Sequence, residues 1–279
     1  MTTPIHRLII STLLVVAHLA LTACTGLQPR SDESLVTHAL ANPGVQQTLA
    51  PQGILRVGVY LGSPTSLVRD AKTGVSSGVA FELGHALGQQ LQVPVQVVQY
   101  QRVSEVIEAL QRGQVDMTFT NATAARARVV DFTPALIQLE LGVLVPTNSP
   151  IKNFAEVDTV GVRLGVSQGS SSEGVLGQRL KNAKLVPVPS LMQAQNMLAS
   201  RELDAFATNK GILFELAEKV PGAQVLQDRW GLENLAIAIP KGRDTAMPYL
   251  REFAQTLVTR GELLQMANRA GLRGLAPAH

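Results

Sequence analysis

Residues 108–121 read EALQRGQVDMTFTN, and residues 196–209 read NMLASRELDAFATN. In both stretches a helical pattern leads to an aspartate, Asp116 or Asp204, then to a short apolar run that ends at an asparagine. This match indicates a weak internal repeat, although two unrelated βαβ units of similar composition would also resemble each other. Under either interpretation, the sequence predicts a helix followed by a buried strand at two places in the chain.

Each stretch closes a longer alternation of strand and helix patterns. In the first half, strand patterns at 54–61, 93–100 and 115–120 alternate with helical patterns at 81–91 and 104–113. The second half repeats the order with strand patterns at 163–171, 184–189 and 203–208. Such alternation predicts right-handed crossovers and an α/β fold with a doubly wound sheet in each half. Ligands bind these sheets beyond the carboxyl ends of the strands, so we expect Asn121 and Asn209 to face one cleft.

Two apolar runs bracket the second half and predict a hinge. Residues 141–150 and 235–244 both end in proline and polar residues, as expected of two strands that cross between lobes. A chain of 279 residues is also longer than the usual single-core domain. We therefore expect a first lobe of residues 52–145 plus 240–279 and a second lobe of residues 146–239.

The N-terminus predicts export and lipid attachment. Residues 8–23 are mostly apolar but too short for a typical membrane span, which fits a signal peptide over residues 1–23. The only cysteine, Cys24, follows Leu-Thr-Ala, which resembles the bacterial lipobox. A lone cysteine is more often a small buried hydrophobe, but this position favours lipidation. We therefore expect an extracytoplasmic protein anchored to a membrane by lipid through Cys24, with residues 24–51 as its tether.

Composition argues against several classes of function. The formal charge of +3 is spread along the chain and aromatic residues make up only 4%, which argues against a nucleic-acid partner. No HExxH, GxSxG, P-loop or cluster of metal ligands occurs, and His85 is expected on the solvent face of its helix. We therefore expect no catalytic residues, no metal and no cofactor.

Two segments could bind an anion. Arg126 and Arg128 follow a predicted strand end, and a guanidinium engages a carboxylate through two parallel hydrogen bonds. The alternative is a surface ion pair, for example with Asp131. In the second segment, a small-residue loop opens a helix, so free N–H groups and the hydroxyls of Ser170 and Ser171 would meet an anion there. A simple N-cap is the alternative for these serines.

These motifs together resemble the family 3 extracellular solute-binding proteins, which are capture subunits of ABC importers for polar amino acids. The motifs that carry the resemblance are GVAFEL, EALQRGQVD, Asn-x-Thr-x-x-Arg-x-x-x-x-Asp-Phe-Thr-Pro, GVSQGSS, SRELDAF and the two hinge strands. The match spans about Ile54 to Gly274, and its most specific piece runs from Thr123 to Pro134. The resemblance implies a two-lobed clamshell of the type II periplasmic-binding-protein class.

The resemblance also implies roles for residues in the cleft. Arg126 matches the arginine that holds the ligand α-carboxylate, and Ser170 and Ser171 match the assisting loop. Asn121 and Thr123, which belong to the same motif as Arg126, are expected to bind the ligand as well. Asn209 stands where the family usually has the acid that pairs with the α-ammonium, and Tyr60 is displaced from the usual position of a stacking aromatic.

Because Asn209 cannot supply a negative charge, two interpretations of the ligand remain open. Another acid or Tyr60 contacts the ammonium, or the ligand is an anion without one. We expect a monomeric receptor whose lobes close on a small anion or zwitterion and deliver it to an ABC permease. The alternatives are an enzyme such as cyclohexadienyl dehydratase on the same fold, or a sensor subunit.

Overall fold

The structure, a computed structural model, describes residues 43–277. The predicted signal peptide (1–23), the predicted lipid site Cys24 and the predicted tether up to residue 42 lie outside the described residues. Among the helices of residues 43–277, none combines the length and the apolar character that a membrane crossing requires.

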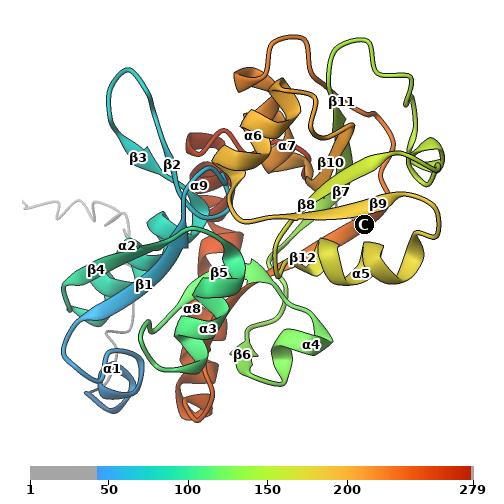
Figure 1. Ribbon diagram of the computed structural model, residues 1–279. Helices are drawn as coiled ribbons and strands as arrows, with labels where there is room; N and C mark the ends of the chain where they lie inside the picture. The colour runs from blue at the N-terminus through green and yellow to red at the C-terminus, as the bar shows by residue number, and fades with distance from the viewer. Residues whose placement is uncertain (1–42, 278–279) are drawn as a thin grey trace, which may run out of the picture. The chain divides into compact units, whose positions relative to one another are not determined.

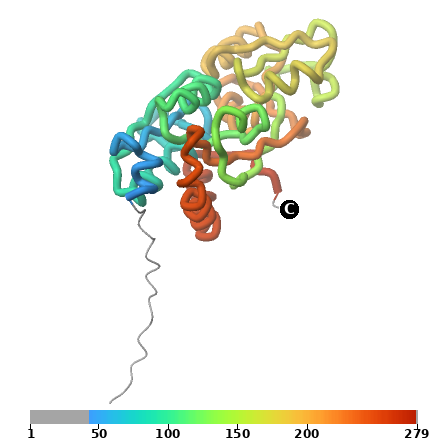
Figure 2. Tube along the Cα trace, turned by 90° about the horizontal axis from the view of Figure 1, so that it is seen from below, coloured from blue at the N-terminus to red at the C-terminus, as the bar shows by residue number. Residues whose placement is uncertain are grey.

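The last part of the predicted tether is folded. Residues 43–49 form helix α1 (Pro43–Leu49), and Leu49 and Ala50 are buried in the core that the first strand also joins. Figure 1 and Figure 2 both draw α1, in blue, beside the strands and helices that follow it in the chain. The tether prediction is therefore wrong for residues 43–51, because the apolar Leu49 is covered by the folded body.

Two long strands form the hinge. Strands β7 (Ile137–Val145) and β12 (Gly231–Pro240) pair antiparallel over 137–141 and 231–235. Beyond this overlap β7 pairs with β10 (Ala205–Asn209), whereas β12 pairs with β5 (Thr118–Asn121) and β6 (Val130–Phe132). The prediction of two crossing strands is confirmed, but both crossings lie earlier in the chain than expected. Here lobe 1 means residues 43–140 plus 232–277, and lobe 2 means residues 141–231.

Lobe 1 is built on parallel strands in the order β4-β1-β5, followed by the antiparallel β12. Strand β1 (Leu55–Tyr60) pairs with β4 (Val95–Tyr100) and meets the chain just before β5 through the bridge between Val57 and Met117. A separate hairpin joins β2 (Val68–Arg69) to β3 (Ser76–Ser77). The helices of the lobe are α2 (Val79–Leu91), α3 (Val103–Gln111), α4 (Ala124–Ala127), η2 (Asp244–Ala246), α8 (Met247–Thr259) and α9 (Glu262–Arg269).

Lobe 2 repeats this strand order as β9-β8-β10, followed by the antiparallel β7. Strand β8 (Arg163–Ser167) lies parallel between β9 (Lys184–Val188) and β10, and β11 (Gln224–Val225) pairs with β7. The helices are η1 (Phe154–Val157), α5 (Ser171–Arg179), α6 (Leu191–Ala199) and α7 (Lys210–Lys219). The shared order supports the internal repeat that the sequence suggests.

Helices cover both faces of each sheet. In lobe 1, α2, α8 and α9 pack on one face and α3 packs on the other. In lobe 2, α5 lies on the face opposite α6 and α7, as Figure 1 shows. Apolar strands buried on both faces are the pattern expected of a doubly wound sheet, so the predicted fold class is confirmed.

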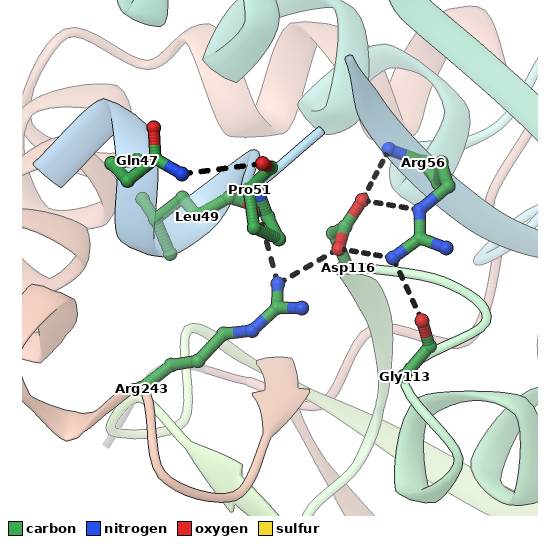
Figure 3. Close-up of polar contacts among 7 residues, drawn as sticks. All are labelled: Gln47, Leu49, Pro51, Arg56, Gly113, Asp116 and Arg243. Atoms are coloured by element: carbon green, nitrogen blue, oxygen red, sulfur yellow. Dashed lines mark hydrogen bonds and ion pairs between the residues drawn. The ribbon is translucent and has the colours of Figure 1, made fainter. Parts of the chain in front are cut away.

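The two lobes carry the same arginine–aspartate anchor. In lobe 1, Nε and Nη2 of Arg56 donate to the two oxygens of Asp116, and Nη2 also reaches the carbonyl of Gly113 (Figure 3). In lobe 2, Arg163 makes the same bonds to Asp204 and to the carbonyl of Arg201. The residue three positions before each aspartate has a left-handed backbone, with φ of 64° in lobe 1 and 60° in lobe 2.

Candidate functional site

A polar cavity lies between the two lobes and spans about 500 Å³ including its mouth. Its lining includes Tyr60, Asn121, Ser170, Ser171 and Asn209 together with Arg126, which are six of the seven binding residues predicted from the sequence. The carboxyl ends of β5 and β10 both open into it, as expected of doubly wound sheets.

Arg126 is the buried cation of this cavity. Its side chain comes from the short helix α4, and the residue is only 9% exposed. Its Nη1 donates to the hydroxyl of Thr120 at 2.9 Å and to the carbonyl of Asn121 at 3.2 Å. Within the described chain, its Nε and Nη2 have no hydrogen-bond partner. One edge of the guanidinium is therefore held by the protein, and the other is free for a ligand.

Two neighbours of Arg126 do not reach the cavity. Thr123 is absent from the lining, and its hydroxyl caps α4 by accepting from the backbone N–H of Arg126 at 3.2 Å. Arg128 is exposed, so the structure brings one guanidinium of this segment to the cleft and not two. Thr123 thus positions the start of α4, which differs from the binding role expected of it.

Ser170 and Ser171 occupy different positions at the start of α5. Ser170 is the N-cap and accepts from the backbone N–H of Glu173 at 3.2 Å. The hydroxyl of Ser171 accepts from Nδ2 of Asn121 at 3.2 Å and donates to Glu233 at 3.3 Å. Ser171 therefore links a side chain of lobe 1 to the hinge strand across the cavity.

Glu233 is an acidic cavity residue that the sequence analysis missed. It lies on β12, is 7% exposed, and lines the cavity together with Leu235, two positions further along the same strand face. The expected hinge run begins at residue 235, so it excludes this acid. Extending the run backwards by one strand period would have placed Glu233 beside Leu235 on the inner face.

Asn209 contacts Glu233 directly. Its Nδ2 donates to Oε2 of Glu233 at 3.0 Å, and its Oδ1 accepts from the backbone N–H of Ile212 at 3.1 Å, which caps α7. Both ends of the amide are therefore used by the protein. The next residue, Lys210, is buried but turns to Glu140, whose oxygen lies 2.7 Å from its Nζ.

Burial shifts the ionisation of both charged groups in the cavity. Burial raises the pKa of the Glu233 carboxyl, and the nearby Arg126 together with the bonds from Asn209 and Ser171 opposes that rise. Burial lowers the pKa of the Arg126 guanidinium, and the charge of Glu233 opposes that fall. Each group thus lies where its charged form is poorly solvated, a common property of functional sites.

Tyr60 reaches the cavity from the end of β1. Burial raises the pKa of its phenol, and interactions with the hydroxyls of Ser63 and Thr65 partly offset the rise. Other lining residues that the sequence analysis did not single out include Thr65, Gln101, Arg102, Thr120, Ser190 and Thr208. His85 is exposed on α2 and does not line the cavity.

Comparison with known proteins identifies the family. The model of the bacterial extracellular solute-binding proteins, family 3, matches residues 55–271. The chain is similar to the glutamine-binding protein of Geobacillus stearothermophilus, with 21% identity over 82% of this chain and 91% of the relative. It is also similar to the ABC transporter glutamine-binding protein GlnH of Bacillus subtilis (strain 168), with 22% identity over 63% of this chain and 66% of the relative.

A solved structure shows the same fold. The ancestral amino acid-binding protein AncCDT-1, a precursor of cyclohexadienyl dehydratase, matches with a TM-score of 0.70 and 24% identity over 80% of this chain and 98% of that one. Within residues 43–277, no group of histidine, cysteine, aspartate and glutamate side chains could hold a metal ion. The family match and the shared two-lobed fold confirm the resemblance drawn from the motifs, and the chain belongs to the bacterial extracellular solute-binding proteins, family 3.

Proposed function

We propose that this chain is a receptor for a polar amino acid, which it binds in the cleft and delivers to an ABC importer in the membrane. The ligand α-carboxylate accepts hydrogen bonds from Arg126, and Ser171 with the start of α5 contacts it from lobe 2. The family and the glutamine-binding relatives support this role. Closure of the lobes brings both sets of donors onto one ligand. The bound ligand therefore makes the closed form more stable than the open form.

The single observation that carries the proposal is the state of the Arg126 guanidinium. It is buried in the cavity wall, it is held on one edge by Thr120 and Asn121, and its other edge has no partner within the described chain. A fixed guanidinium with free parallel donors is suited to a carboxylate. A ligand carboxylate on the free edge would replace the water that this edge loses on burial.

Calorimetric titration with the twenty common L-amino acids tests this role. We expect at least one to bind the full chain, and we expect Arg126→Ala to weaken that binding by at least about 30-fold, as loss of a buried charged partner does. Arg128→Ala is the matched control, since Arg128 belongs to the same segment but is exposed. Unchanged affinity in Arg126→Ala would remove this residue from the site.

We also infer that the receptor is held outside the cytoplasm by lipid on Cys24, after removal of residues 1–23. The lipobox-like residues before Cys24 support this inference, and a diacylated or triacylated cysteine would anchor the chain stably. Cell fractionation tests it, because an anchored chain sediments with membranes and Cys24→Ser should appear in the soluble fraction. Recovery of both forms from the soluble fraction would contradict it.

A dehydratase is the second candidate, and one observation favours it. Glu233 is the only carboxylic acid among the described residues that line the cavity, and burial raises its pKa, as suits a general acid. The solved precursor of cyclohexadienyl dehydratase shares the fold. Formation of product from prephenate or arogenate would select the enzyme, whereas binding without turnover supports the receptor. A sensor subunit would bind the same ligand but couple to a receptor protein in place of a permease.

A further inference from the structure

Two buried charges of opposite sign share the cavity without pairing to each other. Arg126 is 9% exposed and Glu233 is 7% exposed, and the two described side chains form no ion pair with one another. The other cation of the lining, Arg102, is already paired with Glu105 at 2.8 Å. The cavity wall therefore offers one positive and one negative charge that interact through space but are not joined in an ion pair.

The contacts of Glu233 hold its carboxylate without neutralising it. One oxygen accepts from the hydroxyl of Ser171 and the other from the amide of Asn209, and both donors are uncharged. A carboxylate has about four acceptor positions, so roughly two remain for a ligand. The titratable groups that face it are the charged Arg126 from α4 and the neutral phenol of Tyr60 from β1, while its contacts from α5 and β10 are uncharged.

A ligand that carries a negative and a positive charge can pair with Arg126 and Glu233 at the same time. Two buried, unpaired charges are costly because each has lost its hydration. A zwitterion that places its carboxylate on Arg126 and its ammonium on Glu233 removes both costs at once. A dicarboxylate, or an acid with no amine, would leave the carboxylate of Glu233 unpaired beside another anion.

We propose that Glu233 binds the ammonium group of the ligand, so that the cleft selects amino acids over carboxylates that have no amine. This inference rests on the proposed function, since it concerns the ammonium group of the same amino acid ligand. The acid that binds the ammonium then lies on the hinge strand β12 and accepts a hydrogen bond from Asn209. Position 209 is where the family motif leads us to expect that acid.

The test compares amino acids with 2-hydroxy acids of the same side chain. The probes are the twenty common L-amino acids and the 2-hydroxy acid that corresponds to each binder, titrated into the full chain by calorimetry. We expect the wild-type chain to prefer the amino acid by at least about 30-fold, because the hydroxyl cannot supply the positive charge. A wild-type chain that binds both equally overturns the proposal without any variant.

Glu233→Gln then assigns the preference to this residue. Glutamine keeps the shape of the side chain, its oxygen can accept from Asn209, and its amide can donate to the Ser171 hydroxyl. We expect this variant to lose at least about 30-fold in affinity for the amino acid while its affinity for the 2-hydroxy acid changes little. Glu108→Gln, an exposed site on α3, is the charge-matched control.

The outcomes separate this inference from the proposed function. If Arg126→Ala abolishes amino acid binding but Glu233→Gln leaves it intact, the ammonium site alone is contradicted. If the wild-type chain binds no amino acid, the proposed function is contradicted and the ammonium site with it. Loss of the amino acid preference in Glu233→Gln, with the control unchanged, supports both.

Discussion

Asn209 uses both ends of its amide at the end of β10. Its Oδ1 caps α7 through Ile212, and its Nδ2 orients the carboxylate of Glu233. An aspartate here would keep the cap but would place a second carboxylate against Glu233. With the acid on β12, an amide at 209 is the residue that satisfies both neighbours.

At this residue we predict that Asn209→Asp makes stability more dependent on pH. Two carboxyls in contact share a proton, so the pair has one pKa raised well above that of a free side chain. A carboxyl pKa that is higher in the folded than in the unfolded chain stabilises the fold at low pH. That stability is lost as the pH rises through the folded-state pKa.

Thermal unfolding between about pH 4 and about pH 8 measures this effect. Burial already raises the pKa of Glu233, so the wild-type chain should lose some stability over this interval, and Asn209→Asp should lose more. Asn209→Ser, which can cap α7 without adding a charge, is the control. Parallel profiles for the aspartate and serine variants would contradict the prediction.

The sequence predicts Arg126 but not Glu233, because a local pattern indicates where strands end but not which strand residues another lobe covers. The Arg126 motif places an arginine a few residues after a predicted strand end, and strand ends of doubly wound sheets meet at the cleft. Glu233 lies inside a strand whose polar side chains are normally solvated. Its burial depends on lobe 2 covering the hinge, which no local pattern contains. For Thr123, which the motif also leads us to expect in the site, the structure places the hydroxyl on the α4 cap and outside the cavity lining.

At the scale of elements, the two arginine–aspartate anchors have the same bonds but different surroundings. In lobe 1 the Asp116 side chain is 0% exposed and also pairs with Arg243 at 2.8 Å, as Figure 3 shows. In lobe 2 the Asp204 side chain is 35% exposed and its partner Arg163 is 40% exposed. Exposure decides how much an ion pair contributes to the free energy of unfolding, because water screens the charges of an exposed pair.

We therefore predict unequal costs for the same change at the two anchors. Asp116→Asn should destabilise the chain by about 3 to 5 kcal/mol, since it leaves two largely buried guanidinium groups without a counter-charge. Asp204→Asn should cost about 1 kcal/mol or less. Urea unfolding of both variants measures the difference, and equal losses would show that burial does not separate the anchors. Arg163 lowers the pKa of Asp204, so the contribution of that pair is lost as the pH falls through its folded-state value.

The element-level predictions fail where tertiary contacts decide the outcome. The alternation of strands and helices predicts both sheets, because buried parallel strands are apolar throughout. Helix α1 is short and begins at Pro43, and its contacts with the fold come from Leu49, Ala50 and Val45, which pack on the lobe 1 core. The hinge positions depend on the register of β7 against β12, which the apolar runs of the two strands do not specify.

At the scale of the molecule, the C-terminal segment makes a third connection across the hinge. Leu272 belongs to the lobe 1 core, and residues 274–276 then pair with β7, with the Glu140 N–H donating to the Gly274 carbonyl at 2.8 Å. The Arg273 guanidinium lies 4.5 Å from the ring centre of Phe214 on α7 and pairs with Glu218. The prediction that residues 240–279 belong to lobe 1 misses this contact with lobe 2.

We predict that Arg273→Ala loosens this segment. The exposed ion pair contributes little, and the contact with Phe214 contributes about 0.5 to 1 kcal/mol, so local opening should become about 2- to 5-fold more frequent. Hydrogen exchange at the Glu140 amide measures it, and the amides of β10 serve as an internal control. Unchanged exchange at Glu140 would show that the tail is held by its backbone bonds alone.

The hinge register has a practical consequence for protein engineering. Leu141 and Gly231 are paired neighbours on β7 and β12, so lobe 2 leaves the chain and returns to it at adjacent points. In topological terms lobe 2 is a cassette inserted into a host, and its two ends are separated by a single strand spacing, about 5 Å. The same cassette ends are therefore suitable fusion points for a reporter domain, which would convert lobe movement into a measurable signal.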